Sequence, residues 1–240
     1  MTPSSRLGIL GGTFDPIHLG HLAVARTAAA ALRLDSVTFV PSHHPPHRPS
    51  GPRASAYHRF AMIALSVMGE PGMAVSDLEL QRPDVSYTAS TLRALGARGL
   101  DRSQIFFILG ADAFAEIATW KEYPAVLDLS HFVVVSRPAF PVSSLMESVP
   151  SLASRMCELP AGGLAELSHG ETPRIYLVNG QTPEVSSTFI RERLGAGLPV
   201  SGLVAPAVES YIDRHSLYKG AGTRATPEAE GTTGHGRRLA

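Results

Sequence analysis

Short apolar runs alternate with helix-forming segments along most of the chain, and this alternation restricts the fold more than any other feature. Residues 6–11 (RLGILG) are typical of a buried strand, and the alanine-rich residues 19–33 (LGHLAVARTAAAALR) favour a helix. Repeated units of this kind predict an α/β fold, with a doubly wound, mostly parallel sheet and helices on both faces. In such sheets ligands bind outside the carboxyl ends of the strands.

The same patterns predict the remaining elements. Further strands are expected at residues 36–41, 73–80, 104–110, 131–138 and 174–178, and further helices at residues 54–69, 86–99, 111–120, 185–194 and 205–218. Residues 142–170 give only weak helical signals, interrupted by Ser, Pro and Gly. Residues 220–240 lack large apolar residues apart from Leu239. The sequence therefore predicts one domain, residues 1–219, followed by a disordered tail.

The composition argues against several classes of protein. Lys plus Arg and Asp plus Glu both number 21, so no net charge favours binding to nucleic acid or to an anionic membrane. The single cysteine, Cys157, excludes an intramolecular disulfide and fits a reducing compartment. The N-terminal apolar stretch is too short for a signal peptide, and no window is long enough for a membrane span. We expect a soluble cytoplasmic protein that binds neither nucleic acid nor membrane.

The motif GGTFDPIHLGHL follows the first predicted strand directly. Gly11 and Gly12 remove side chains where the backbone leaves this strand, so backbone amides can approach an anion closely. The helix that follows adds unpaired amides and the positive end of its dipole. His18 and His21 lie one helical turn apart and would flank one anion. The alternatives are a tight turn with a histidine cap, or a zinc site, for which no third ligand at a fixed spacing is evident.

The motif VSSTFIR predicts a second helix N-terminus with hydrogen-bond donors. Ser186, Ser187 and Thr188 supply hydroxyl and amide groups, and Arg191 follows about one turn later with a guanidinium fork. Taken alone, a Ser-Ser-Thr run is also typical of an ordinary helix cap. Together with the first motif it indicates a shared polyphosphate site.

The two motifs resemble the signatures of the nucleotidylyltransferase superfamily. Between them PSHHPPHRP, SYTASTL, GADAF, TWKEY and VVSRP occur in the order found in bacterial nicotinate-nucleotide adenylyltransferases, and the similarity runs from about residue 7 to residue 218. The resemblance implies a Rossmann-like nucleotidylyltransferase fold. It also implies transfer of AMP from ATP to nicotinate mononucleotide, with pyrophosphate released and Mg²⁺ accompanying ATP. The 5'-phosphate is ionised at neutral pH, so attack on the α-phosphorus needs no general base.

The resemblance also assigns roles to individual residues. It makes His18, His21 and Arg191 the catalytic residues, with His21 as the candidate contact to the α-phosphate. Binding of ATP and its phosphates is assigned to Gly11, Gly12, Thr13, Phe14, Gly110, Asp112, Arg137, Ser187 and Thr188. Binding of the mononucleotide is assigned to Arg48, Tyr87, Thr88 and Trp120. No residue is assigned to a protein-bound metal.

Several alternatives stay open on sequence grounds. Trp120 could be an ordinary packing residue, Asp112 could cap a helix starting at Ala113, and Arg137 could neutralise a strand end. His43, His44 and His47 could form a metal cluster, but the prolines between them predict an extended loop, which the resemblance assigns to substrate contact. Rival functions are a pantetheine-phosphate adenylyltransferase, a cytidylyltransferase, or a nucleotide-binding module without catalysis. The sequence also leaves a homo-oligomer open.

Overall fold

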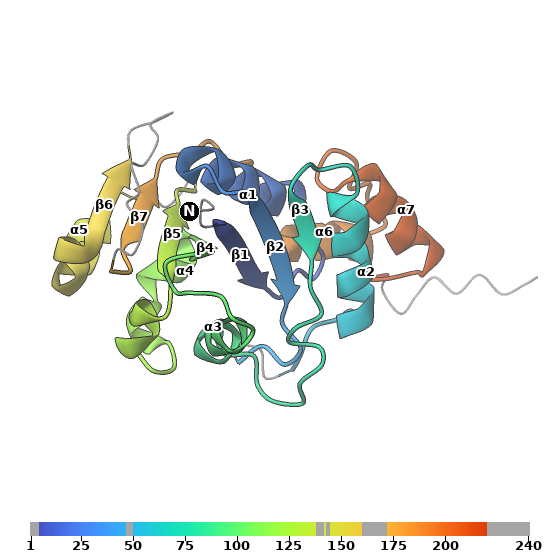
Figure 1. Ribbon diagram of the computed structural model, residues 1–240. Helices are drawn as coiled ribbons and strands as arrows, with labels where there is room; N and C mark the ends of the chain where they lie inside the picture. Colours follow the sequence, from blue (N-terminus) through green and yellow to red (C-terminus); the bar gives the residue numbers. More distant parts are fainter. Residues whose placement is uncertain (1–4, 47–49, 138–141, 143–144, 160–171, 220–240) are drawn as a thin grey trace, which may run out of the picture.

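A parallel seven-stranded sheet forms the centre of the computed structural model, which describes residues 5–46, 50–137, 142, 145–159 and 172–219 (Figure 1). The strand order is β3-β2-β1-β4-β5-β7-β6, and every pairing is parallel. The strands are β1 Leu7–Gly12, β2 Ser36–Pro41, β3 Met73–Val75, β4 Ile105–Gly110, β5 His131–Val135, β6 Met156–Leu159 and β7 Ile175–Val178. The predicted α/β class and the parallel sheet are confirmed.

Helices cover both faces of this sheet. They are α1 Leu19–Leu32, α2 Ala56–Val67, α3 Thr88–Ala97, α4 Ala111–Ala115, α5 Leu145–Ser148, α6 Ser187–Gly195 and α7 Pro206–Arg214, with 3-10 turns η1 Ile117–Thr119, η2 Ala125–Asp128 and η4 Pro150–Arg155. Helices α1, α2, α6 and α7 pack into one apolar core, and α3, α4 and α5 pack into the other. In Figure 1, the edge strand β3 lies beside α2, with α7 beyond α2, and the opposite edge strand β6 lies beside α5. No helix among the described residues is long and apolar enough to cross a membrane.

Side chains of the central strands alternate between the two cores. In β1, Leu10 packs on the α1 side and Ile9 on the α3 side. In β4, Phe106 packs on the α1 side and Phe107 on the α3 side. Because successive strand residues point to opposite faces, a strand covered on both sides must be apolar at every position. This explains the continuous apolar runs in the sequence.

The structure corrects two of the predicted elements and adds one strand. The strand expected at residues 73–80 ends at Val75. Its later alternation reflects Leu78 and Glu79, which are buried in a turn and pair with no strand. The helix expected at residues 111–120 breaks into α4 and η1. Strand β6 was not predicted, because four residues that include a charged one give too weak a pattern for an edge strand. The predicted tail, residues 220–240, lies outside the described residues.

The order of the strands fixes where a ligand can bind. The chain runs from β1 outward to β3 and then returns to β4, on the other side of β1. At such a switch point the loops after the two central strands diverge and leave a crevice at their carboxyl ends. Gly11 and Gly12 end β1, and Gly110 ends β4. The predicted glycines therefore lie on the edge of this crevice.

Candidate active site

His18 and His21 lie together at the start of α1. His18 is the N-cap residue of this helix and is only 3% exposed. The two imidazole rings stack with their centroids 3.7 Å apart. The backbone N–H of His18 donates to Nδ1 of His21 over 3.2 Å, so a neutral His21 carries its proton on Nε2. That N–H is the group which His21 can offer to a ligand.

Gly20 and Phe14 set the positions of the two rings. A Cβ atom on Gly20 would come within 3.0 Å of both Nδ1 of His18 and Cγ1 of Val185, so only glycine fits without displacing a neighbour. Phe14 is 2% exposed and packs edge-on against His21, with 4.9 Å between the centroids. Its φ of 50° lies in the left-handed region, which is uncommon for a residue with a side chain. The buried ring of Phe14 packs against His21. Only the backbone of Phe14 is therefore left for contact with a ligand.

Both histidines are neutral near pH 7 in the ligand-free protein. Burial, and then the positive charge of Arg137, lower the pKa of His18 from 6.5 to about 3. Burial, His18 and Arg137 also lower the pKa of His21 well below its usual range. The imidazoles are therefore available as neutral N–H donors, and the positive charge nearby resides on the arginines.

These shifts predict a loss of stability in acid. Because the pKa of His18 is about 3 in the folded protein and 6.5 in the unfolded chain, the unfolded state binds the proton first as the pH falls. We expect His18 to reduce the free energy of unfolding by about 2 kcal/mol between about pH 7 and about pH 5. Denaturant unfolding of His18→Asn should show a weaker pH dependence, whereas His215→Asn, at an exposed position of the chain, should keep the wild-type slope. An unchanged slope in His18→Asn would contradict the assignment.

The two sequence motifs meet at the loop that follows β1. Ser187 Oγ donates to the carbonyl oxygen of Pro16 over 2.8 Å. Arg191 Nη1 donates to the carbonyl oxygen of Asp15 over 2.7 Å. The N-terminus of α6 therefore lies beside the N-terminus of α1, as a shared polyphosphate site requires.

The hydroxyl groups of the second motif hold α6 in place. Ser186 is the N-cap residue, and its Oγ accepts the N–H of Phe189 over 3.1 Å. Thr188 Oγ1 accepts a hydrogen bond from Arg191 Nη2 over 3.0 Å. The first amides of a helix have no partner within it, so those of Ser187 and Thr188 remain the donors suited to an anion. The motif can therefore cap the helix and also offer backbone amides to a phosphate.

An ion pair joins α4, which follows β4, to the segment after β5. Arg137 Nη1 lies 3.1 Å from Oδ2 of Asp112, and Arg137 Nη2 donates to the carbonyl oxygen of Val185 over 3.4 Å. The N-cap residue of α4 is Gly110, so the alternative in which Asp112 caps a helix starting at Ala113 is wrong. A Cβ on Gly110 would come within 2.4 Å of Oδ1 of Asp112, so a side chain at this position would displace the carboxylate.

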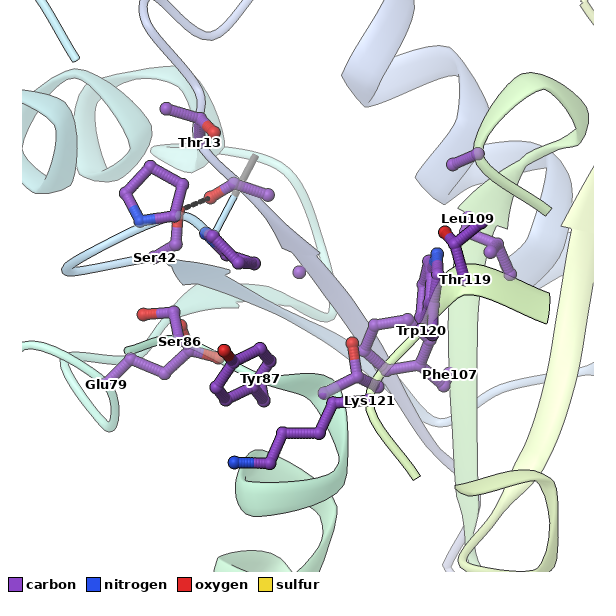
Figure 2. Close-up of a pocket in the computed structure, with 16 residues that line it drawn as sticks. Thr13, Ser42, Glu79, Ser86, Tyr87, Phe107, Leu109, Thr119, Trp120 and Lys121 are labelled. Atoms are coloured by element: carbon purple, nitrogen blue, oxygen red, sulfur yellow. Dashed lines mark hydrogen bonds between the residues drawn. The ribbon is translucent and has the colours of Figure 1, made fainter. Parts of the chain in front are cut away.

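A cavity of about 290 Å³ lies next to the loop after β1. Gly11, Gly12 and Thr13 line it from the end of β1. Figure 2 shows Ser86 and Tyr87 on one side of it and Phe107 and Trp120 on another. His18, His21 and Arg191 are not among its lining residues. The predicted site therefore divides into this cavity and the adjoining helix N-termini.

The cavity combines an aromatic wall with a third helix N-terminus. Trp120 stands edge-on against Phe107, with 6.2 Å between the centroids and 88° between the planes. Tyr87 is the N-cap residue of α3, and both it and Thr88 line the cavity. Lys121 Nζ lies 4.3 Å from the centre of the Tyr87 ring. An apolar ring with an anionic substituent would find both an aromatic partner and unpaired amides here.

Glu79 is a buried acid of this cavity that the sequence analysis missed. It is 9% exposed, and its Oε1 accepts a hydrogen bond from the hydroxyl group of Thr91 over 2.5 Å. Burial raises the pKa of Glu79, although hydrogen bonds from Thr91 and Ser86 favour its charged form. Ser86 Oγ in turn accepts the backbone N–H of His43 over 2.9 Å. Glu79 thus joins the corner before α3 to the loop after β2, and no sequence pattern marks it.

Arg59 is a second missed residue, and it holds the backbone of the site. Its side chain is 1% exposed. It donates to the carbonyl oxygens of Thr13, Ser42 and Ala54 over 2.6, 2.7 and 3.3 Å. The sequence did carry a signal, because Arg59 falls at helical spacing from buried Met62 and sits on the buried face of α2. A charged side chain on such a face requires buried partners.

His43 and His44, in the loop after β2, are engaged in local contacts. His43 Nδ1 donates to the carbonyl oxygen of Arg82 over 2.7 Å, and its ring stacks on His44 with centroids 4.1 Å apart. Within the described residues no group of three or more His, Cys, Asp or Glu side chains is placed to hold a metal ion. His47 and Arg48, the predicted phosphate contact, lie outside the described residues.

Comparison with known proteins identifies the family. The profile of the cytidylyltransferase-like family matches residues 9–193. A probable nicotinate-nucleotide adenylyltransferase of Citrifermentans bemidjiense is 41% identical over 214 residues, which cover 89% of this chain and 98% of the relative. The chain belongs to the nicotinate-nucleotide adenylyltransferase family. A second probable nicotinate-nucleotide adenylyltransferase, from Desulfatibacillum aliphaticivorans, is also 41% identical, over 89% of this chain and 99% of its own length.

Solved structures agree with this family at the level of the fold. Plasmodium falciparum nicotinic acid mononucleotide adenylyltransferase complexed with NaAD superposes with a TM-score of 0.67. The match covers 89% of this chain and 97% of the other, at 19% sequence identity. The Rossmann-like nucleotidylyltransferase fold predicted from the sequence is therefore confirmed.

Proposed function

We infer that the protein is a nicotinate-nucleotide adenylyltransferase, which transfers AMP from ATP to nicotinate mononucleotide and forms nicotinate adenine dinucleotide and pyrophosphate. The observation that carries this function is the meeting of the two motifs at Asp15 and Pro16. It brings two helix N-termini and Arg191 to the loop after β1, and Gly12 and Thr13 of this loop line the cavity that Trp120 also lines. Charged phosphates and a flat aromatic ring would each find suited partners in this arrangement.

The proposed reaction is a direct displacement at phosphorus. An oxygen of the mononucleotide 5'-phosphate forms a bond to the α-phosphorus of ATP, and the bond from that phosphorus to the bridging oxygen breaks. Pyrophosphate leaves with the electron pair of the broken bond. Because the attacking phosphate is already ionised, the protein needs no general base and forms no covalent intermediate. Its work is to position the two substrates and to stabilise the developing charge.

Neutral and charged groups of the site are proposed to contact different phosphates of ATP. In this proposal His21 Nε2–H donates to an α-phosphate oxygen, and neutral His18 donates beside it. Arg191 and the first amides of α6 hold the β- and γ-phosphate oxygens. Magnesium would enter as the counter-ion of ATP, coordinated by phosphate oxygens and water, and would neutralise the charge of the departing pyrophosphate. Asp112 is proposed to bind the adenosine ribose.

The cavity is the proposed site of the mononucleotide. The pyridine ring would stack on Trp120, and its carboxylate would accept the free amides of Thr88 and its neighbours at the start of α3. Glu79 would keep the corner before α3 in place through Ser86 and Thr91. The assignment of Arg48 to the substrate phosphate remains a prediction.

Trp120→Leu is expected to raise the KM for nicotinate mononucleotide by roughly tenfold, because an aliphatic side chain cannot replace ring stacking. The KM for ATP should change less than about twofold, since Trp120 lies away from the two helix N-termini. Steady-state kinetics with each substrate varied in turn measures both values. Equal changes in the two KM values would contradict the stacking role.

Pyrophosphate release with ATP tests the function directly. The purified protein is assayed in parallel with nicotinate mononucleotide, nicotinamide mononucleotide and phosphopantetheine. Rapid release with the nicotinate substrate alone is the expected result. Faster release with phosphopantetheine would instead favour a pantetheine-phosphate adenylyltransferase, and release with none would favour a nucleotide-binding module.

A further inference from the structure

The side chain of Tyr218 reaches from the C-terminal end of the described chain to the loop after β1. It follows α7 and is 8% exposed. Its hydroxyl donates to Oδ1 of Asp15 over 2.8 Å, across a separation of 203 residues. Burial raises the pKa of Tyr218, so the hydroxyl keeps its proton and remains a donor at working pH. A distant segment thus fixes the first motif.

Asp15 lies between Tyr218 and Arg191. Its side chain is fully buried, and the backbone N–H groups of Arg53 and Ala54 donate to its two carboxylate oxygens over 2.8 and 3.0 Å. Arg191 Nη1 lies 4.0 Å from Oδ2 of Asp15, while it donates to the carbonyl oxygen of the same residue. The direction in which this guanidinium points therefore depends on how well other donors satisfy the carboxylate.

The backbone before Tyr218 is bent in a way that aims this side chain inward. Ser216 has a φ of 50° and Tyr218 a φ of 65°, both in the left-handed region. The N–H of Leu217 donates to the carbonyl oxygen of Ile212 over 3.0 Å and closes the turn. Residues with side chains hold such conformations only where their surroundings require it, and they often do so beside functional sites.

We propose that Tyr218 is a positioning residue for Arg191, acting through the carboxylate of Asp15. Without the hydroxyl, Oδ1 loses one donor and the carboxylate attracts the guanidinium more strongly. Arg191 then turns toward Asp15 and away from the phosphates of ATP. This inference rests on the proposed function, because it gives Arg191 a triphosphate to hold.

The test compares Tyr218→Phe with Tyr211→Phe. Tyr211 lies in α7 and hydrogen-bonds to His58 at 2.9 Å, so its variant also removes one tyrosine hydroxyl but leaves Asp15 untouched. We expect Tyr218→Phe to lower kcat/KM for ATP by about tenfold, since the lost hydrogen bond is to a charged acceptor. The KM of Tyr218→Phe for nicotinate mononucleotide should stay within about twofold of the wild-type value. In Tyr211→Phe, kcat and both KM values should also stay within about twofold of wild type.

A double-mutant cycle with Arg191→Ala separates this role from a general loss of structure. If Tyr218 acts through Arg191, the tenfold effect should shrink to less than about twofold when Arg191 is absent. The same four proteins can also be compared by their affinity for a non-hydrolysable ATP analogue, measured by calorimetry. This measurement needs no catalytic turnover. Replacement of Tyr218 by 4-aminophenylalanine restores a donor on the same ring and should rescue both values. Rates are expressed per folded molecule, from the thermal unfolding curve of each variant.

Three results would overturn the proposal. These are an unchanged constant in Tyr218→Phe, the same loss in Tyr211→Phe, or a full additional loss in the Arg191→Ala background. Absence of pyrophosphate release in the wild-type protein with every mononucleotide would instead reject the proposed function. The calorimetric cycle would then still decide whether Tyr218 acts on Arg191.

Discussion

Replacing His21 by alanine is expected to lower kcat by about 10²- to 10³-fold, with little change in the KM for ATP. Removing one donor to a charge that develops in the transition state typically has an effect of this size. The geometry supports this role, because the backbone of His18 occupies Nδ1 of His21 and leaves Nε2–H for the ligand. Steady-state kinetics and a single-turnover measurement of product formation would separate the chemical step from binding.

The matched control for this experiment is His215→Ala. His215 is an exposed histidine that follows α7, and its ring contacts Tyr211 of α7 and His58 of α2. Its removal should leave kcat and both KM values unchanged. A large rise in the KM for ATP with normal kcat in His21→Ala would show that His21 serves ground-state binding only.

Arg191→Ala is expected to lower kcat/KM for ATP by about 10³-fold, through loss of a charged donor in a largely buried position. Arg191→Lys should recover only a small part of this loss. One guanidinium donates at the same time to the carbonyl oxygen of Asp15 and to Oγ1 of Thr188, and an ammonium group cannot match this fork. Kinetics with ATP varied at saturating nicotinate mononucleotide measures the effect.

Arg193→Ala provides the control on the same helix. Its Nε donates to the carbonyl oxygen of Pro199, at the far end of α6 from the phosphate site. This variant removes the same charge from the protein and should keep nearly normal kinetics. Equal losses in Arg191→Ala and Arg193→Ala would indicate a general effect of charge or helix stability.

The sequence was sufficient for those parts of the site that lie in short motifs. Spacing along one helix placed His18 beside His21, and the resemblance to relatives joined them to the segment that carries Arg191. The structure brings the N-terminus of α6 to the loop after β1, and Gly11, Gly12 and Trp120 line one cavity, while the roles of these residues stay predictions. Local patterns succeed here because each group is positioned by its own strand or helix.

The residues that sequence reasoning missed act across long separations. Arg59 reaches Thr13 over 46 residues. Tyr218 reaches Asp15 over 203 residues. No periodicity connects such pairs, because their contact depends on how α2 and the segment after α7 pack on the finished sheet. Strand β6 escaped prediction for a related reason, since its place at the edge comes from pairing with β7.

The contact between Tyr218 and Asp15 has a consequence for the biosynthesis of the protein. The sheet can form from earlier strands, but the loop after β1 acquires the hydrogen bond from Tyr218 only when the segment after α7 has emerged and docked. A chain closed over 203 residues gains this contact late in folding. If Tyr218 positions Arg191 as proposed, nascent or clipped chains that lack Tyr218 would keep the strands of the sheet and yet transfer AMP more slowly, so activity would report that the chain extends as far as Tyr218.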